Sequence, residues 1–169
     1  MAGVITVAIS ILLVAIDQVI KLFVHMGLKP IGIVEFIPGF LQFRYVENTG
    51  AAFGILQQKT GFLIVMTIIV MAIGFYILFF QKLNGKVQYA GAILILSGGL
   101  GNLIDRMVRH YVIDYIEFTF VDFAVFNFAD ILITVGAFLL IASLVKELIE
   151  ETKRGKAEKA QNLQEEKDA

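Results

Sequence analysis

Four long apolar stretches, separated by more polar segments, dominate the pattern of the chain. They cover residues 4–24, 61–80, 87–104 and 127–146. Each is close to the roughly 20 residues that a helix needs to cross about 30 Å of hydrocarbon. Because a strand or loop exposed to lipid would leave backbone groups unpaired, the pattern predicts four transmembrane helices.

The segment after the first apolar stretch, residues 26–59, is more polar and contains both prolines of the chain. Within it, Phe40–Val46 alternates Gln42 and Arg44 with bulkier residues, which predicts a short strand. We therefore expect a small extramembrane β-sheet on the membrane surface after the first helix. Asn48 follows the strand in a run of small residues, and it is open to interpretation as a turn former or as a functional residue.

Two further segments lie outside the predicted helices. Residues 105–126, between the third and fourth helices, include an alternation of polar and apolar residues at 115–120, which indicates an extended or interfacial segment. Residues 147–169 are densely charged with both signs, so they are predicted to form a solvated tail, either helical or disordered.

Composition supports an all-α membrane protein that forms a single domain over residues 1–169. Hydrophobic residues make up 58% of the chain and the mean hydropathy is +0.81. The net charge of -1 and the scattered basic residues give no reason to expect a nucleic-acid partner. The chain has no cysteine, which excludes disulfides and thiol catalysis. The first helix lacks a basic region before it and a small-residue cleavage site, so we expect it to be retained rather than removed as a signal peptide.

Basic residues are distributed unevenly about the predicted helices. One side carries Lys82, Lys86, Lys146, Lys153, Arg154, Lys156 and Lys159, and the other carries Lys29, Arg44, Lys59, Arg106 and Arg109. The excess favours a multi-pass protein with both termini in the cytoplasm. Residues 26–59 and 105–126 are then extracytoplasmic.

Polar residues gather near one predicted membrane interface, the outer one. They are Asp17, Asn48, Asn102, Asp105, Arg106, Asp114, Asn127 and Asp130. Ionisable groups in or beside spans are costly, and they are functional candidates that usually face the interior of the helix bundle. This layer is therefore the candidate site.

Two of the four acids in this layer have a cation close by in the sequence. Asp17 and Lys21 are four residues apart on one helical face, and Asp105 is followed directly by Arg106. We expect each pair to form an ion pair with a structural role.

The other two acids, Asp114 and Asp130, have no cation within four positions except on a loop, where Arg109 and His110 lie closest to Asp114. Two carboxyl groups that face each other without a cation share a proton, which is the state that aspartic proteases use. The alternatives are a helix N-cap for Asp130 and a turn carboxylate for Asp114. The pattern as a whole favours the catalytic interpretation.

Other kinds of site and of protein fit the pattern less well. His25 and His110 lack the spacing of metal ligands, so we expect no metal and no cofactor. A small proton-coupled transporter using Asp17 or Asp130 is an alternative, although its key acid would lie near mid-span. A non-catalytic scaffold subunit, in which glycines and ion pairs serve only packing, is another.

The residues in five places give the chain a resemblance to the signal peptidase II family, the lipoprotein signal peptidases. They are Asp17, Gln18 and Lys21; Asn48 to Phe53; Gly101, Asn102, Asp105 and Arg106; Val112 to Tyr115; and Phe126, Asn127, Ala129 and Asp130. The chain departs from the family pattern at Ile20, where Ser or Thr is usual, and at Tyr115, where Phe is usual.

This resemblance implies an aspartic endopeptidase of the bacterial cytoplasmic membrane. Its substrates would be prolipoproteins whose cysteine carries a diacylglyceryl group, and the bond before that cysteine would be cut at the outer face. The resemblance assigns catalysis to Asp114 and Asp130, substrate binding to Asn48, Arg106 and Asn127, and support of the site to Asp17, Lys21, Asn102 and Asp105. We expect no cofactor, contact with membrane lipid, and a monomer.

Two placements suggest how the extramembrane segments would act. The strand Phe40–Val46 could hold the substrate in an extended form by strand addition. Residues 118–126 could act as a lid that limits the access of water.

Overall fold

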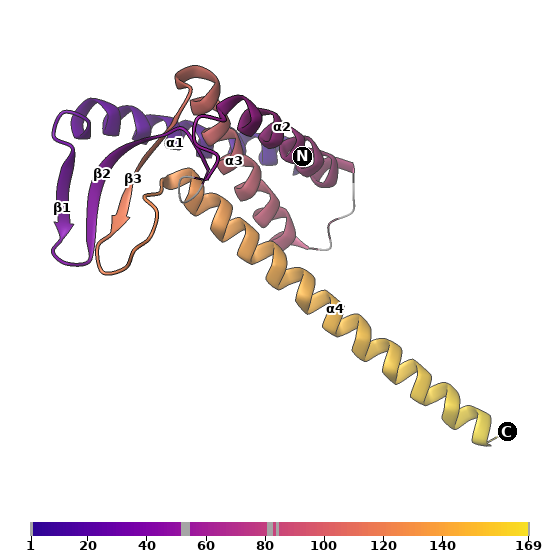
Figure 1. Cartoon of the computed structure of the whole chain (residues 1–169). Coiled ribbons are helices and arrows are strands. Elements are labelled where there is room, and N and C mark those ends of the chain that lie inside the picture. The colour runs from indigo at the N-terminus through magenta and orange to yellow at the C-terminus, as the bar shows by residue number, and fades with distance from the viewer. Residues whose placement is uncertain (1, 52–54, 81–82, 84, 169) are drawn as a thin grey trace.

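The computed structural model describes residues 2–51, 55–80, 83 and 85–168. Ala52 and Phe53 of the Asn48 motif, and Lys82 of the basic turn, lie outside this range. The elements in chain order are α1 (Ala2–Phe23), η1 (Val24–Leu28), β1 (Ile33–Ile37), β2 (Leu41–Asn48), α2 (Thr60–Phe80), α3 (Lys86–Arg109), β3 (Val112–Phe118) and α4 (Phe128–Asp168). Figure 1 shows their arrangement.

Four helices of the described chain are long and apolar enough to cross a membrane, which confirms the predicted helical membrane fold. Their spans are Val4–Leu28, Thr60–Phe80, Lys86–Arg109 and Phe128–Lys156. The first is completed by η1, a short π-helix that continues α1.

Two helix ends differ from the predicted ones. α3 continues past residue 104 to Arg109, where an ion pair between Asp105 and Arg109 joins successive turns. α4 runs without a break through the charged residues 147–168. Of the two forms predicted for this tail, helical or disordered, the structure has the helical one, as a continuation of the fourth helix. Lys146 and Glu150, four residues apart, form one of the exposed pairs that favour helix there.

α3 is the central helix of the bundle, and α1, α2 and α4 all pack against it (Figure 1). Its closest neighbour is α4. A Cβ atom built on Gly91 would lie 2.8 Å from the Gly136 carbonyl oxygen, and one built on Gly136 would lie 2.6 Å from the Gly91 oxygen. Glycine at both positions lets the two backbones approach, as is common in membrane bundles.

The glycine-rich run at the middle of α3 is continuous helix, so it provides close contact rather than a break. A Cβ atom on Gly98 would collide with the Ala129 carbonyl oxygen at the start of α4. One on Gly101 would lie 2.5 Å from Asp17 Oδ2 on α1. These two glycines bring the polar ends of α1 and α4 against one face of α3.

The extramembrane sheet has three antiparallel strands in the described residues, in the order β1-β2-β3. β2 confirms the strand predicted at Phe40–Val46, and β3 forms within the segment predicted as extended. β2 is the central strand and is paired on both edges, so the predicted strand addition of a substrate to it was wrong. β1 was not predicted; all of its residues are exposed, so Ile33–Ile37 shows no alternation of buried and polar positions.

The register of the sheet brings two site segments together. Val46 pairs with Asp114 and Asn48 with Val112, beside a bulge between Phe43 and Val46. The inner end of β3 is buried, since Val112 and Ile113 are 2% and 0% exposed. β3 therefore fixes Asp114 beside the end of β2.

Residues 119–127 return the chain from β3 to α4. Phe126 forms an isolated bridge with Ile116, and its backbone N–H donates to the Ile116 carbonyl at 3.0 Å. The rings of Phe118, Phe123 and Phe126 contact one another. This aromatic cluster holds the return segment beside the start of α4.

Candidate active site

Asp114 lies on β3 and is held by two asparagine side chains. Asn48 Nδ2 donates to its Oδ2 at 2.9 Å, and Asn127 Nδ2 donates to its Oδ1 at 2.6 Å. Asn48 is itself fixed, because its Oδ1 accepts from the Gly50 backbone N–H at 2.9 Å in a turn after β2. Asn48 therefore forms a turn with one end of its side chain and holds Asp114 with the other.

Asp130 lies in the first turn of α4, within a reciprocal capping box. Asn127 Oδ1 accepts from the Asp130 N–H at 3.0 Å, and Asp130 Oδ2 accepts from the Asn127 N–H at 3.1 Å. The N-cap of α4 is therefore Asn127, and the N-cap interpretation of Asp130 was wrong. Asp130 Oδ1 accepts from Asn102 Nδ2 on α3 at 2.8 Å.

Asn127 links the two carboxyl groups, because its side chain contacts Asp114 while its backbone contacts Asp130. The pKa of Asp114 is raised to about 7, first by burial and then by the negative charge of Asp130. A carboxyl group with this pKa keeps a proton near neutral pH. The two carboxyl groups can therefore share one proton near neutral pH.

Asp114 and Asp130 line the same cavity, of about 520 Å³. Its polar end also includes Asn48, Asn102 and Arg106. Its other end is apolar and is formed by α4 residues 131–135 together with residues 123–126 of the return segment. The polar groups thus stand at one end of a pocket that continues along a membrane-spanning helix.

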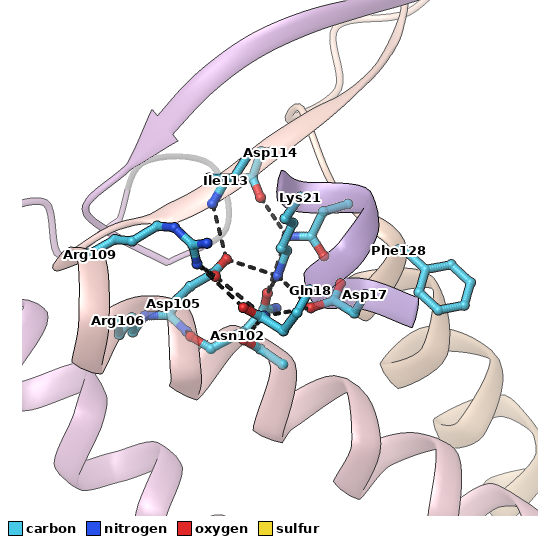
Figure 2. Close-up of polar contacts among 12 residues, drawn as sticks. Asp17, Gln18, Lys21, Asn102, Asp105, Arg106, Arg109, Ile113, Asp114 and Phe128 are labelled. Carbon is cyan, nitrogen blue, oxygen red and sulfur yellow. Dashed lines mark hydrogen bonds and ion pairs between the residues drawn. The ribbon is translucent and has the colours of Figure 1, made fainter. Parts of the chain in front are cut away.

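Behind this cavity lies a buried charge cluster centred on Lys21 (Figure 2). Lys21 is 0% exposed, and its Nζ lies 2.9 Å from Asp17 Oδ2, from Asp105 Oδ2 and from Asn102 Oδ1. The predicted pairing of Asp17 with Lys21 is confirmed. Lys21 also contacts the site, since Asn102 accepts from Lys21 and donates to Asp130.

The predicted pairing of Asp105 with Arg106 was wrong. Asp105 pairs with Lys21 and with Arg109, whose Nη1 lies 2.5 Å from Asp105 Oδ1. Successive residues on a helix point in different directions, whereas residues four apart share a face. Arg109, placed on a loop by the sequence, is the last residue of α3.

Arg106 instead faces the cavity. Its guanidinium donates to the carbonyl oxygens of Asn102 at 3.4 Å and Gly50 at 3.2 Å. It therefore connects α3 to the turn that carries Asn48. Every residue predicted for the site except Asn127 lies in the cavity wall or in the charge cluster behind it, and Asn127 is a buried link between Asp114 and Asn102.

Two contributors were given no role from the sequence. Gln18 Nε2 donates to Asp17, to Asp105 and to the Gly101 carbonyl oxygen, at 3.1, 3.3 and 3.1 Å. The Tyr115 hydroxyl accepts from the Phe128 N–H at 3.2 Å, which joins β3 to the start of α4. Local sequence spacing does not reveal the contacts of Gln18 with Gly101 and Asp105, because they depend on how α1 and α3 pack.

The chain is similar to known proteins over most of its length. The family model described as Signal peptidase (SPase) II matches residues 9–146. Two proteins named lipoprotein signal peptidase, from Streptococcus pyogenes serotype M5 (strain Manfredo) and serotype M3 (strain ATCC BAA-595 / MGAS315), are 43% and 42% identical to this chain over 137 residues. These alignments cover 81% of this chain and 90% of each relative.

Two solved structures are also similar to this chain. Two structures described as bacterial membrane enzymes, obtained by the in meso method at 2.3 and 1.9 Å resolution, superpose with TM-scores of 0.78 and 0.75 at 34% and 35% identity. The superpositions cover 85% and 83% of this chain and 88% and 92% of theirs.

Proposed function

The chain belongs to the signal peptidase II family, the membrane peptidases that remove signal peptides from prolipoproteins, and we propose that it does so as an aspartic endopeptidase with Asp114 and Asp130 as its catalytic dyad. The observation that carries this proposal is the linkage of two carboxyl groups through Asn127 at the polar end of one cavity. The transporter alternative has no support among the relatives.

The raised pKa of Asp114 supports a division of roles within the dyad. Asp130 takes a proton from a water molecule whose oxygen forms a bond to the scissile carbonyl carbon, while Asp114 gives its proton to the carbonyl oxygen. In the second step the carbon–nitrogen bond breaks, the leaving nitrogen takes the proton from Asp130, and Asp114 regains its proton from a hydroxyl. No covalent intermediate with the enzyme forms.

The surrounding residues would position the substrate. Arg106 lines the cavity beside both carboxyl groups, so its guanidinium is suited to bind a substrate backbone carbonyl. Asn48 has a double role in this proposal, because it holds Asp114 and also borders the space for the scissile bond. Asn127 is buried and holds Asp114, so it would act on the substrate through that carboxyl group. Asp17, Lys21, Asn102 and Asp105 support the dyad from behind.

The apolar end of the cavity suits a lipid-modified substrate. Ile131, Ile133 and Val135 lie on a helix long enough to cross the membrane, so the diacylglyceryl group and the apolar signal peptide can enter without leaving hydrocarbon. Phe123 and Phe126 border the opposite wall as part of the proposed lid. Cleavage would follow before the lipidated cysteine.

The site would lie at the outer face of the bacterial cytoplasmic membrane, with the C-terminal part of α4 in the cytoplasm. This orientation is supported by the distribution of basic residues and by the even number of spans in the described chain. Because one chain supplies both carboxyl groups, a monomer suffices for catalysis.

The decisive test uses a diacylglyceryl-modified prolipoprotein and three purified variants. Asp114→Asn and Asp130→Asn should each lower kcat by at least about 1,000-fold, since either change removes one of the two proton transfers. The matched control is Glu35→Gln, which neutralises an exposed carboxyl group on β1 outside the catalytic cavity and should keep full activity. Turnover by either dyad variant at the wild-type rate would falsify the dyad.

A further inference from the structure

A second cavity, of about 390 Å³, adjoins the catalytic one at Asp114. The two cavities share Asn48, Asp114, Ala124 and Val125 in their walls. The second is completed by polar residues of the sheet and of the turn that follows it, among them Arg44 and Glu47. Asp114 therefore borders two spaces of different character.

The two cavities also differ in the elements that form them. The catalytic cavity includes residues 131–135 of α4, within a membrane span. The lining residues of the second cavity all lie outside the spans found in the described chain. A substrate cut at Asp114 has an apolar signal peptide and a lipidated cysteine at the bond, and a chain destined for water after that cysteine, so each of these two parts matches one cavity.

Arg44, in the wall of the second cavity, carries a hydrogen-bond donor without a partner in the described part of the chain. Its Nε is buried and has no acceptor among the described residues, while its Nη2 pairs with Glu117 Oε1 at 2.9 Å. Glu117 is fixed in turn, because its Oε2 accepts from Gln42 Nε2 at 2.6 Å. Buried donors without an acceptor are rare in folded proteins, and a guanidinium held on one edge can bind a carbonyl oxygen with its Nε–H.

The position of Arg44 on β2 sets the part of the substrate that it can reach. Arg44 and Asn48 both line this cavity, and they are four residues apart on β2, a span of about 13 Å along the strand. Asn48 holds Asp114. An extended chain that starts at the scissile bond covers this distance in about four residues.

We infer that the second cavity binds the residues that follow the lipidated cysteine, as an extended backbone, and that the Arg44 Nε–H donates to one of their carbonyl oxygens. Arg44 would then favour substrates in which several residues follow the lipidated cysteine. This inference rests on the proposed function, and it concerns the part of the substrate after the lipidated cysteine, which the membrane-facing cavity does not hold.

The test compares two diacylglyceryl-modified peptides that are identical through the cysteine. The short peptide ends one residue after the cysteine, and the long one continues for six further residues. With the full-length wild-type protein, the long peptide should have about a tenfold lower KM. Arg44→Met should raise the KM of the long peptide to that of the short one and leave kcat unchanged for both.

Two further variants separate recognition from sheet stability. Glu117→Gln removes the charge that pairs with Arg44 but leaves its Nε–H, so the advantage of the long peptide should persist. Arg44→Lys keeps the positive charge without the Nε–H, so most of the advantage should be lost.

The outcomes are distinguishable. Equal KM values for both peptides in the wild type, or a KM ratio unchanged in Arg44→Met, would overturn the inference while leaving the peptidase activity established. A loss with both peptides in Arg44→Met that Glu117→Gln reproduces would assign Arg44 to the sheet alone and overturn it too. Failure of the wild type to cut either peptide would instead overturn the proposed function.

Discussion

At the scale of single residues, the site holds its carboxyl groups with neutral amides rather than with cations. Asn48 and Asn127 donate to Asp114, and Asn102 donates to Asp130. A cation in direct contact would favour the charged form strongly. Lys21 is kept one amide away, because it donates to Asn102 and not to Asp130. This arrangement orients both carboxyl groups and still permits one of them to keep a proton.

The raised pKa of Asp114 predicts an alkaline limit for turnover. Burial is the main cause and the charge of Asp130 the second, and together they place the pKa at about 7. As the pH rises through this value Asp114 loses the proton that the proposed mechanism requires it to donate, so kcat/KM should fall about tenfold per pH unit above 7. A profile of kcat/KM measured from pH 5 to 9 checks this, and it should show two apparent ionisations that belong to the dyad as a unit. A profile that stays flat to pH 9 would contradict the proton-donor role.

The same shift predicts how stability changes with pH. The pKa of Asp114 is 3.8 when unfolded and about 7 when folded, so between these values the folded state binds more protons and its stability falls as the pH rises. Asn cannot be charged, so the stability of Asp114→Asn relative to wild type should rise by up to about 4 kcal/mol between pH 4 and pH 8. Thermal midpoints measured in detergent at pH 5 and pH 8 test this. The difference between variant and wild type should be clearly larger at pH 8; an equal difference at both pH values would exclude the shift.

At the scale of helices and strands, the buried cluster joins α1 to α3. Lys21 meets both Asp17 and Asp105, and Arg109 completes the neutralisation of Asp105. Charges of opposite sign compensate the cost of burial only while all partners are present. The contact between α1 and α3 therefore depends on each member of the cluster.

Removal of the central cation should destabilise this contact strongly. Lys21→Met leaves two buried carboxylates without their shared partner, for which we expect a loss of about 3–5 kcal/mol. Asp17→Asn should lower the thermal midpoint more than it lowers kcat, because Asp17 contacts Lys21 and not the dyad. The control is Lys29→Met, which removes an exposed pair with Glu47. An Asp17→Asn protein with a wild-type midpoint and no turnover would move Asp17 into the catalytic group.

The glycines of α3 provide a second test of the same interface. A methyl group on Gly101 would lie 2.5 Å from the carboxylate of buried Asp17, which cannot move without breaking the cluster. Gly101→Ala should therefore cost about 2–3 kcal/mol. Gly99→Ala is the matched control, since its methyl group would meet the flexible end of Met71 at 2.8 Å and that side chain can shift. Equal midpoints for the two variants would show that α1 and α3 do not depend on this close approach.

These elements also show how far the sequence alone leads. The helices follow from long apolar stretches, and the Asp17–Lys21 pair follows from local spacing. The contact between Lys21 and Asp105 joins residues far apart in the chain, so only packing reveals it. The four-residue spacing of Asp105 and Arg109 is that of a helical ion pair, but the prediction chose the adjacent Arg106 as the partner of Asp105. β1 could not be predicted from the sequence pattern, because its residues are all exposed and show no alternation.

At the scale of the whole molecule, the site lies where spanning and extramembrane elements meet. α3 and α4 bring Asn102 and Asp130, whereas β2 and β3 bring Asn48 and Asp114. The charged part of α4 extends away from the other elements (Figure 1). With four spans in the described chain, the sheet and this end of α4 are on opposite sides of the membrane. The proposed function requires the sheet to face outward.

The absence of cysteine makes the orientation directly measurable. Since the chain has no thiol of its own, a single introduced cysteine is the only labelling site in the protein. Asp122→Cys, exposed between β3 and α4, should react with a membrane-impermeant maleimide in intact cells. Lys153→Cys, exposed on the charged part of α4, should react only after the membrane is permeabilised. The wild-type chain gives the background. Labelling with the opposite pattern would place Asp114 and Asp130 on the cytoplasmic side, where a prolipoprotein cysteine presented at the outer face could not reach them.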